Sequence, residues 1–181
     1  MKTKTHGKKL IYRGKHRYST NLYGMWIQKG KEKYWKTYAM VKAGVAVIPL
    51  TEKNKIVMIR EYKVLVKDYI WQIPTGYIEK NSSLTQNAKK ELEEETGYTA
   101  TNFKKLFNFY PSMGSLIQKF TIVLAKNAVK TKKAKPEKRE DIGIAKEFTI
   151  KEAVKMVEKG KIFHDSTIMG IYYLASKLRR R

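Results

Sequence analysis

The sequence contains no cysteine, which excludes disulfide bonds, thiol nucleophiles and zinc sites built on thiolates. Its three histidines, His6, His16 and His164, are scattered and show no metal-ligand spacing. Long apolar runs are also missing, because the longest, residues 43–50, is far shorter than the roughly 18 residues of a membrane span. We therefore expect a soluble, cytoplasmic protein without a membrane partner, in which any metal is hard and bound by oxygen.

Acidic residues are scarce as well. The 181 residues include 39 lysines and arginines but only 16 aspartates and glutamates, a formal net charge of +23. Residues 2–36 contain a single acid, Glu32, and further basic runs occupy residues 126–139 and 179–181. Such an excess of positive charge attracts partners that carry phosphates, including RNA.

The length and the 42% hydrophobic content suit one domain with a proper core and short appendages. Residues 1–40 mix basic residues with aromatics and turn glycines, and predict a basic, aromatic arm of short antiparallel strands. Residues 41–181 are expected to form the main domain. The aromatic side chains of the arm either stack on a base or sugar or simply pack at a sheet edge.

Apolar patterns in the main domain predict strands and helices of ordinary length. Residues 43–50 are apolar enough to form a strand that is buried on both faces. Residues 126–140 are polar and basic and predict a loop that is able to move. The predicted strands are residues 43–50, 55–60, 69–73, 106–110, 119–125 and 142–148, and helices are predicted at 150–159 and 166–178.

A further helix is marked at both ends. Ser83 with Gln86 three residues later forms a capping-box pattern, and Gly97 stands where a left-handed C-terminal cap belongs. These signals predict a helix over residues 84–96.

Most of the chain's acid clustering lies on this helix. At about 100° per residue, Glu95 falls inside the apolar stripe formed by Leu84, Ala88 and Leu92, with Glu91 at its border. A carboxylate in a core-facing stripe is costly to desolvate without a cation, so Glu95 indicates metal ligation or a buried ion pair.

The remaining glutamates of the helix differ in their direction. Glu94 lies further round from Glu91, while Glu93 points to the far side and is interpreted as merely solvated. Carboxylates one turn apart on one face suit Mg²⁺ or Mn²⁺, which complete their shells with water and substrate phosphates. The pattern therefore indicates phosphoryl chemistry.

The stretch from Gly76 to Tyr98 resembles the Nudix box, G-x5-E-x7-R-E-U-x-E-E-x-G-U, with Ser82 in place of the first Glu and Lys90 in place of the Arg. The resemblance covers roughly residues 41–178. Further landmarks, similar to the ADP-ribose pyrophosphatase branch, are Arg60-Glu-Tyr-Lys, Trp71-Gln-Ile-Pro-Thr-Gly, Tyr110-Pro-Ser-Met-Gly, Glu140-Asp-Ile and Glu158-Lys-Gly-Lys-Ile.

This resemblance implies an α/β fold, a Nudix-type α/β/α sandwich with a mixed β-sheet, preceded by the short N-terminal antiparallel strands. It implies Mg²⁺- or Mn²⁺-dependent hydrolysis of ADP-ribose or a related nucleoside diphosphate sugar, giving a nucleoside monophosphate and a sugar phosphate. In this branch the N-terminal strands often reach a partner subunit, which implies a homodimer.

The resemblance also assigns roles by position. Glu91, Glu95, Glu140 and the backbone carbonyl of Thr75 would bind metal. Glu94 and Glu137 would be catalytic, Glu94 in support of the metal site and Glu137 as the general base. Substrate contacts are expected from Arg60, Lys63, Gly76, Met113 and Gly114, with Lys63 standing where the branch tends to place a phosphate-binding arginine.

The departures from the family pattern fall mostly on acids. Ser82, Gln118 and Lys138 stand where carboxylates are expected, Lys138 at the position of the catalytic base, one residue from Glu137. Glu79 is a possible substitute for Ser82. The lost acids and the basic segments leave open an alternative, a Nudix-fold RNA-binding or ribonucleoprotein component with weakened or absent catalysis. A third option is a Nudix enzyme for capped RNA or nucleoside triphosphates.

Overall fold

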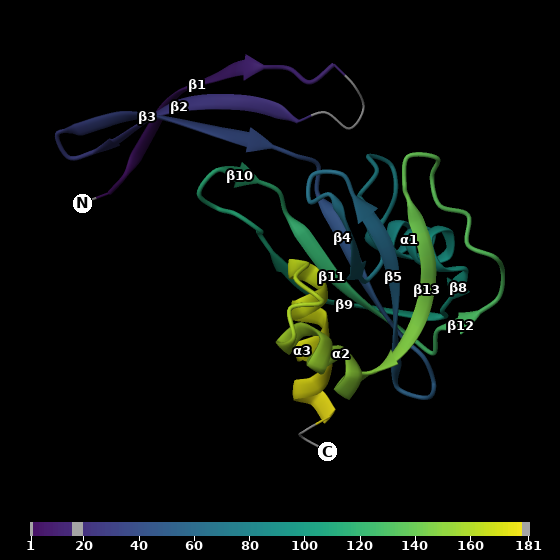
Figure 1. Cartoon of the computed structure of the whole chain (residues 1–181). Helices are drawn as coiled ribbons and strands as arrows, with labels where there is room; N and C mark the ends of the chain where they lie inside the picture. Colours follow the sequence, from purple (N-terminus) through teal and green to yellow (C-terminus); the bar gives the residue numbers. More distant parts are fainter. Residues whose placement is uncertain (1, 16–19, 179–181) are drawn as a thin grey trace. The chain divides into compact units, whose positions relative to one another are not determined.

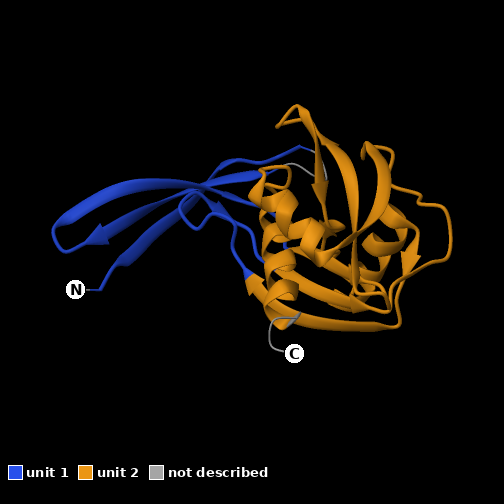
Figure 2. Cartoon of the chain, turned by 60° about the horizontal axis from the view of Figure 1, so that its bottom comes forward, with its two compact units in different colours: residues 1–43, 109–120 blue, residues 44–108, 121–181 orange. Residues whose placement is uncertain are grey.

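In the computed structural model, residues 2–15 and 20–178 are described, the last without its side chain. His16 and the basic residues 179–181 lie outside this part of the chain. The chain divides into two compact units, one of residues 1–43 and 109–120 and the other of residues 44–108 and 121–181 (Figure 2). The first unit includes residues 109–120, which the sequence placed in the main domain, while the predicted domain boundary at residue 40 stays a prediction.

The first unit is a four-stranded sheet in the order β1-β2-β3-β10. Three strands of nine residues, β1 (Lys4–Tyr12), β2 (Asn21–Lys29) and β3 (Glu32–Met40), run antiparallel, and β10 (Leu116–Ile117) lies parallel to β3. The predicted antiparallel arm is present, but its strands are longer than expected.

The second unit is built on a seven-stranded sheet with β13, β5, β4, β11 and β9 in that order, β6 beside β5 and β7 beside β4. The predicted strands are confirmed to within a few residues, apart from an earlier start of β9 and a later end of β5. The strands are β4 (Gly44–Leu50), β5 (Lys55–Lys63), β6 (Asp68–Gln72), β7 (Thr75–Tyr77), β9 (Asn102–Phe109), β11 (Phe120–Lys126) and β13 (Ile142–Thr149), with a small ribbon of β8 (Tyr98–Thr99) and β12 (Val129–Lys130).

Helices cover both faces of this sheet (Figure 1). On one face, Val45 and Val57 of the sheet share a buried cluster with Ala88 and Leu92 of α1 (Leu84–Thr96). Successive strand residues point to opposite faces, and Ile48 accordingly meets α3 (Asp165–Leu178), which packs beside α2 (Ile150–Glu158). The predicted α/β/α sandwich is confirmed. Among the described residues, no helix is long and apolar enough to cross a membrane.

Helix α1 forms as its sequence predicts. The Ser83 hydroxyl accepts a hydrogen bond from the Gln86 amide, and the Gln86 side chain accepts one from the Ser83 amide. Gly97 closes the helix in the left-handed conformation, with φ of 73°. These caps fix where α1 begins and ends. The position of each glutamate along the helix then determines the side to which its carboxylate points.

Candidate active site

Glu95 is the most deeply buried carboxylate of α1, with 2% of its surface exposed. Its Oε2 accepts a hydrogen bond from the backbone amide of Thr75 at 3.2 Å. Burial raises the pKa of Glu95 well above its ordinary value, and the nearby charges of Glu91, Glu140 and Glu61 raise it further. The charges that act on Glu95 are thus of its own sign, so a cation would be favoured beside it.

Glu91 lies one turn earlier and is 8% exposed. Its carboxylate fills the space beside Gly76, where a β-carbon would come within 2.0 Å of Oε1. Burial raises the pKa of Glu91 to about 7, against the opposing effect of Lys90. The absent side chain of Gly76 therefore lets a buried carboxylate lie directly against the β7 backbone.

Glu140 and Glu137 approach from the loop before β13. The amide of Glu137 donates to Oε2 of Glu140 at 3.0 Å, and the amide of Glu140 donates to the carbonyl of Glu137 at 2.9 Å. Burial raises the pKa of Glu140, and the charges of Glu137 and Glu61 act in the same direction. This small turn therefore brings the predicted fourth ligand into the field of Glu91 and Glu95.

Lys90 links the two carboxylates predicted to be catalytic. Its Nζ lies 3.6 Å from Glu94 Oε2 and 3.7 Å from Glu137 Oε1. Burial lowers the pKa of Lys90, but the carboxylates of Glu94, Glu91 and Glu137 outweigh it and raise that pKa. Arg139 Nε, 2.8 Å from Glu137 Oε2, adds a second cation to this group.

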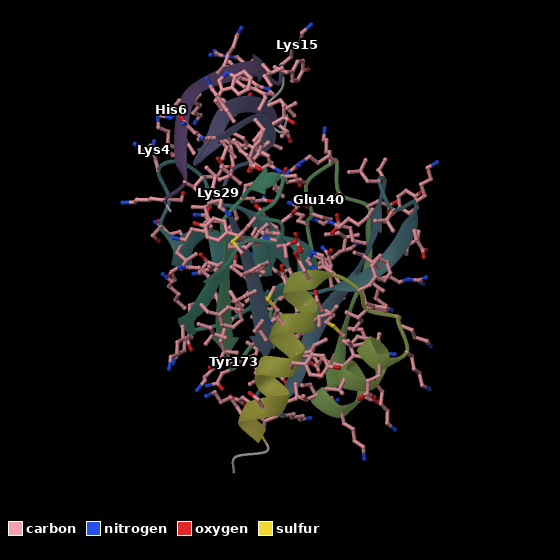
Figure 3. All side chains as sticks on the ribbon, turned by 90° about the vertical axis from the view of Figure 1, so that its left-hand side faces the viewer. Lys4, His6, Lys15, Lys29, Glu140 and Tyr173 are labelled. Atoms are coloured by element: carbon pink, nitrogen blue, oxygen red, sulfur yellow. The ribbon has the colours of Figure 1, made fainter. Side chains whose placement is uncertain are left out.

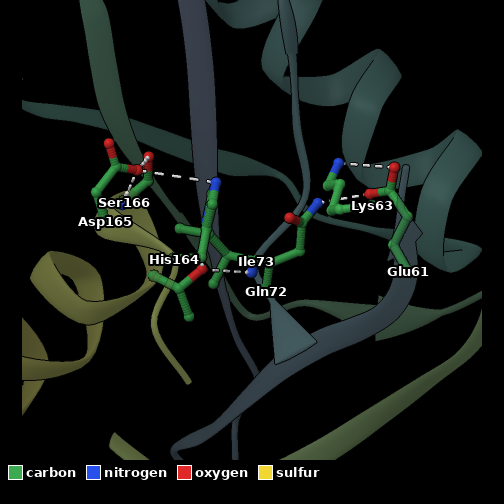
Figure 4. A network of polar contacts seen from close by, with 8 residues as sticks. Glu61, Lys63, Gln72, Ile73, His164, Asp165 and Ser166 are labelled. Carbon is green, nitrogen blue, oxygen red and sulfur yellow. Dashed lines mark hydrogen bonds and ion pairs between the residues drawn. The ribbon is translucent and has the colours of Figure 1, made fainter. Parts of the chain in front are cut away.

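Glu61 of β5 belongs to the same acidic group, although we did not predict it. It is 7% exposed and accepts a hydrogen bond from Gln72 Nε2 at 2.6 Å. It also forms an ion pair with Lys63 Nζ at 2.7 Å (Figure 4). The signal was present in the strand pattern, because Glu61 shares its face of β5 with the core residues Val57 and Ile59. A carboxylate on a core-facing strand position indicates a site as clearly as one on a helix.

The strand end that leads to Thr75 is held from the opposite face of the sheet. The amide of Ile73 donates to the hydroxyl of Thr167, which also contacts Nδ1 of His164 at 2.9 Å (Figure 4). Burial lowers the pKa of His164, with Asp165 opposing the change. These contacts fix the backbone on which the predicted Thr75 carbonyl ligand lies.

The remaining predicted residues are spread more widely. Arg60 is exposed on β5, with its guanidinium 5.4 Å from the centre of the Tyr69 ring. Met113, which is 84% exposed, and Gly114 belong to the other unit, so their substrate contacts stay predictions. Gln118 also belongs to that unit, where its side chain donates to the Lys42 carbonyl.

Ser82 is exposed in the loop before α1, and Lys138 is exposed beside Glu137. Glu79 donates its amide to Asn87, and its charge contributes to the raised pKa of Lys90. Glu79 therefore lies within the electrostatic reach of the acidic group. Its role as a substitute for Ser82 stays a prediction.

Glu93 is not merely solvated, and that interpretation was wrong. Lys132 Nζ lies 2.8 Å from its Oε2, and this hydrogen bond is the main cause of its lowered pKa. The loop that carries Lys132 also donates backbone amides to Gly97 and, through Lys135, to the Glu94 carbonyl. Pairing of β12 with β8 anchors the same segment, so the basic loop is tied to the end of α1.

The donor chemistry of the site fits a hard divalent cation. Across residues 2–15 and 20–178, no three His, Cys, Asp or Glu side chains are close enough to hold a metal ion as they stand. Glu95 instead accepts from the Thr75 amide, and Glu91 lies against Gly76. The charges of Glu91, Glu140 and Glu61 all raise the pKa of Glu95, so these carboxylates are neighbours of Glu95.

Comparisons with known proteins agree with this arrangement. The NUDIX domain model matches residues 40–169. The chain is 32% identical over 133 residues to the ADP-ribose pyrophosphatase of Bacillus subtilis (strain 168), covering 74% of this chain and 72% of that protein. It is also 32% identical over 130 residues to the methanol dehydrogenase activator of Bacillus methanolicus, covering 72% and 70% of the two chains.

A solved structure, described as an ADP compounds hydrolase, superposes with a TM-score of 0.81 over 99% of this chain and 95% of its own, at 16% sequence identity. At that identity the likeness concerns the fold. Family assignment comes from the domain match and from relatives at 32% identity over more than two thirds of their length. The chain therefore belongs to the Nudix family, and the enzyme class predicted from its sequence, a Nudix pyrophosphatase, is confirmed.

Proposed function

We propose that the protein hydrolyses the diphosphate bond of ADP-ribose or a related nucleoside diphosphate sugar, and that it requires Mg²⁺ or Mn²⁺ to do so. The observation that carries this proposal is the burial of Glu95 and Glu91 on α1 against the backbone of Thr75 and Gly76. Buried carboxylates surrounded by others of the same charge are unfavourable without a cation. The similarity to an ADP-ribose pyrophosphatase supports the choice of substrate class.

The metal would be held by the side chains of Glu91, Glu95 and Glu140 and by the Thr75 carbonyl. Glu61 is a further donor, because its charge acts on both Glu95 and Glu140. When bound, the metal neutralises charge on the diphosphate oxygens and makes a water molecule more acidic.

The protein's own residues would prepare the water and the leaving group. Glu137 is proposed to take a proton from the attacking water as the water oxygen bonds to one phosphorus and the bridging P–O bond breaks, which gives a nucleoside monophosphate and a sugar phosphate. Lys90 and Arg139 lie beside Glu137 and favour its ionised form, in which it can act as a base. Glu94, on the other side of Lys90, would support the same water or the metal.

Substrate binding is proposed for the five residues predicted from the resemblance. Arg60 is exposed, and among the described residues it forms no ion pair. Its guanidinium is therefore available to bind a phosphate. Lys63 is already paired with Glu61, and we propose that it contacts phosphate while it retains this partner. Gly76, Met113 and Gly114 would contribute backbone or surface contacts. The homodimer implied by the family resemblance is also proposed rather than observed.

One assay tests the proposal directly. The purified protein is incubated with ADP-ribose and either Mg²⁺, Mn²⁺ or EDTA, and AMP release is followed. We expect metal-dependent release that falls by about a hundredfold or more in Glu95→Gln, since metal-assisted charge stabilisation supplies several kcal/mol. Glu52→Gln, the same chemical change at an exposed turn, should retain the wild-type rate.

The same assay distinguishes the hydrolase proposal from the alternative of a Nudix-fold RNA-binding component with weakened or absent catalysis. No metal-dependent release from ADP-ribose or from a panel of nucleoside diphosphate sugars would reject the hydrolase proposal. Release from capped RNA or nucleoside triphosphates alone would keep the metal site and change the substrate.

A further inference from the structure

A hollow on the outer side of α1 is lined by charged side chains and one glutamine. Its volume is about 460 Å³, which lies within the range of small-molecule sites. Five lysines against two glutamates give it a formal charge of +3. We call it the lysine pocket: α1 contributes Lys89, Lys90, Glu93 and Glu94, and the loop after β12 contributes Lys132, Lys133 and Lys135.

The lysine pocket and the predicted metal site lie on different sides of α1. Glu93 and Glu95 are two residues apart, so at about 100° per residue their side chains point about 160° apart around the helix axis. Glu93 lines the pocket, whereas Glu95 is buried and bonded to Thr75. Of the lining residues, Lys90 and Glu94 also belong to the group around Glu137, and the test below leaves both unchanged.

The backbone of the loop after β12 is fixed against the end of α1. The amides of Thr131 and Lys132 donate to the Gly97 carbonyl. The amide of Lys135 donates to the Glu94 carbonyl at 2.8 Å. A side chain at Gly97 would obstruct this approach, since a β-carbon there would come within 2.2 Å of the Lys132 carbonyl. Backbone contacts, rather than attraction between side chains, therefore hold the lysines of the loop at the pocket.

Two of these lysines lack a counterion. Lys133 and Lys135 are exposed, and neither forms an ion pair with any residue in 2–15 or 20–178. Lys132, the neighbour of Lys133, is paired with Glu93 at 2.8 Å. Lysines that the backbone holds close together repel one another, so an anion that bridges them would be favoured.

Positive charge alone does not mark this place as a site. Side-chain nitrogen atoms project from many parts of the surface, as those of Lys4, Lys15 and Lys29 in the other unit show (Figure 3). The lysine pocket differs from such surface because its cations line one hollow and the backbone beneath them is fixed.

We infer that the lysine pocket binds a compact polyphosphate anion. Ammonium groups bind phosphate oxygens as point charges, and a ligand with several phosphate groups contacts several lysines at once. Among the described residues that line the pocket, none is aromatic or aliphatic, so the lining offers no apolar surface to a nucleobase or an acyl chain. A nucleic-acid single strand is a poorer occupant for the same reason, because its bases would have no ring on which to stack.

The inference does not rest on the proposed hydrolysis, and it is tested without it. Isothermal titration calorimetry measures the binding of tripolyphosphate to the full-length protein in EDTA and low salt. Without divalent metal the carboxylates of the metal site repel an anion, so the lysine pocket is the site that is measured. We expect saturable binding of one tripolyphosphate per chain, tighter than that of orthophosphate by about tenfold or more, because each added charged hydrogen bond has an effect of that order.

Two matched double variants separate the pocket from net charge. Lys133→Gln with Lys135→Gln should weaken tripolyphosphate binding by about tenfold or more, since the two lysines without a counterion are lost. Lys151→Gln with Lys155→Gln removes the same charge from two exposed positions of α2. This control should change the affinity much less, because it lowers only the general positive field.

Glu93→Gln should strengthen binding. It removes a carboxylate from the pocket and releases Lys132, so the formal charge of the lining rises. Misfolding cannot produce this gain, and unchanged circular dichroism checks the fold of each variant.

Four outcomes would overturn the inference. Absence of saturable binding by the wild type would exclude the site, and equal losses in the two double variants would show that net charge alone attracts the anion. Loss of binding in Glu95→Gln, which should keep the wild-type affinity, would place the anion at the metal site. A short oligouridylate that binds more tightly than tripolyphosphate and shows the same loss in Lys133→Gln with Lys135→Gln would assign the pocket to nucleic acid. Failure of ADP-ribose hydrolysis leaves all these binding results as they are, so the two proposals fail separately.

Discussion

The carboxylate of Glu91 occupies the space that a side chain at Gly76 would fill. A β-carbon at residue 76 would come within 2.0 Å of Glu91 Oε1 and 2.6 Å of Oε2. Glycine is needed at residue 76 because it leaves room for the buried Glu91 carboxylate. Its backbone angle is not the reason, since a positive φ is found at Gly7, Gly30, Gly97 and Gly160 but not at Gly76.

Gly76→Ala should separate catalysis from folding. The new methyl group displaces the far end of a flexible side chain, so we expect a loss of stability of about 1 kcal/mol or less. Activity should fall by about a hundredfold, because a shift of 1 Å in a positioned catalytic group can have that effect. The measurements are kcat/KM for ADP-ribose and the urea midpoint.

Gly143→Ala is the control for this substitution. A β-carbon at Gly143 would meet only the Arg60 carbonyl, at the ordinary contact distance of 3.7 Å. Retained activity in Gly143→Ala with loss in Gly76→Ala is the expected pair of results. Equal activity of Gly76→Ala and the wild type would show that the position of Glu91 is not needed.

The stability of the metal-free protein should depend on pH through Glu91. Burial raises the pKa of Glu91 from 4.5 to about 7, so the folded state holds this proton more tightly than the unfolded state. The corresponding stability is present below the unfolded pKa and is lost as pH rises through the folded one. One pKa unit corresponds to about 1.4 kcal/mol, so unfolding free energy should fall by at most about 3 kcal/mol between pH 4.5 and 8.

Urea unfolding in EDTA across this pH range measures the effect. Glu91→Gln, which cannot ionise, should make the profile shallower, with the remaining slope due to Glu95 and Glu140, whereas Glu52→Gln at an exposed turn should leave it unchanged. Added Mg²⁺ should stabilise the wild type most at high pH, where the ligands are ionised. A Glu91→Gln profile as steep as that of the wild type would assign the pH dependence to other groups.

The ion pair between Lys132 and Glu93 should contribute little to stability despite its short distance of 2.8 Å. The Lys132 side chain is 54% exposed, and exposed pairs typically contribute about 0.2 to 1 kcal/mol. The loop is also held by the hydrogen bond from the Lys135 amide to the Glu94 carbonyl. A double-mutant cycle of Lys132→Gln and Glu93→Gln should therefore yield a coupling energy below about 1 kcal/mol. A larger value would show that the pair, rather than the backbone, anchors the loop.

The helix and its carboxylates could be predicted from the sequence because their signals are local. Capping residues set the ends of α1, and helical periodicity then determined that Glu95 faces the core and Glu91 lies beside it. The main-domain strands were predicted correctly for the same reason, because each is marked by an apolar pattern within its own residues.

The errors arose where a partner comes from a distant segment. Glu93 was interpreted as solvated because Lys132, its partner, is far along the chain and reaches it only once the basic loop folds back. Glu61 was missed although the alternation along β5 points it toward the core; its neighbours Gln72 and Glu95 lie on β6 and α1, and no local pattern joins these elements. Residues 109–120 join the N-terminal unit through the pairing of β10 with β3, which no local pattern indicates.

Lys90 should orient the two carboxylates between which it lies. Lys90→Gln removes the cation within 3.7 Å of both Glu94 and Glu137, so kcat should fall. We expect a fall of about tenfold, less than the roughly hundredfold or more that a general base contributes, because Arg139 still contacts Glu137. Lys90→Arg should restore most of the rate, since a guanidinium keeps the charge and can donate to two carboxylates at once.

The pH profile of kcat distinguishes this role from a merely structural one. With one cation fewer to favour the ionised base, the acid limb of the profile in Lys90→Gln should move to higher pH, and Lys90→Arg should return it to the wild-type position. Lys89→Gln, on the same helix but paired only loosely with Glu93 at 4.0 Å, is the control and should leave the limb in place. A fall in kcat without a displaced acid limb would mean that Lys90 supports the fold of the site and does not set the charge state of its base.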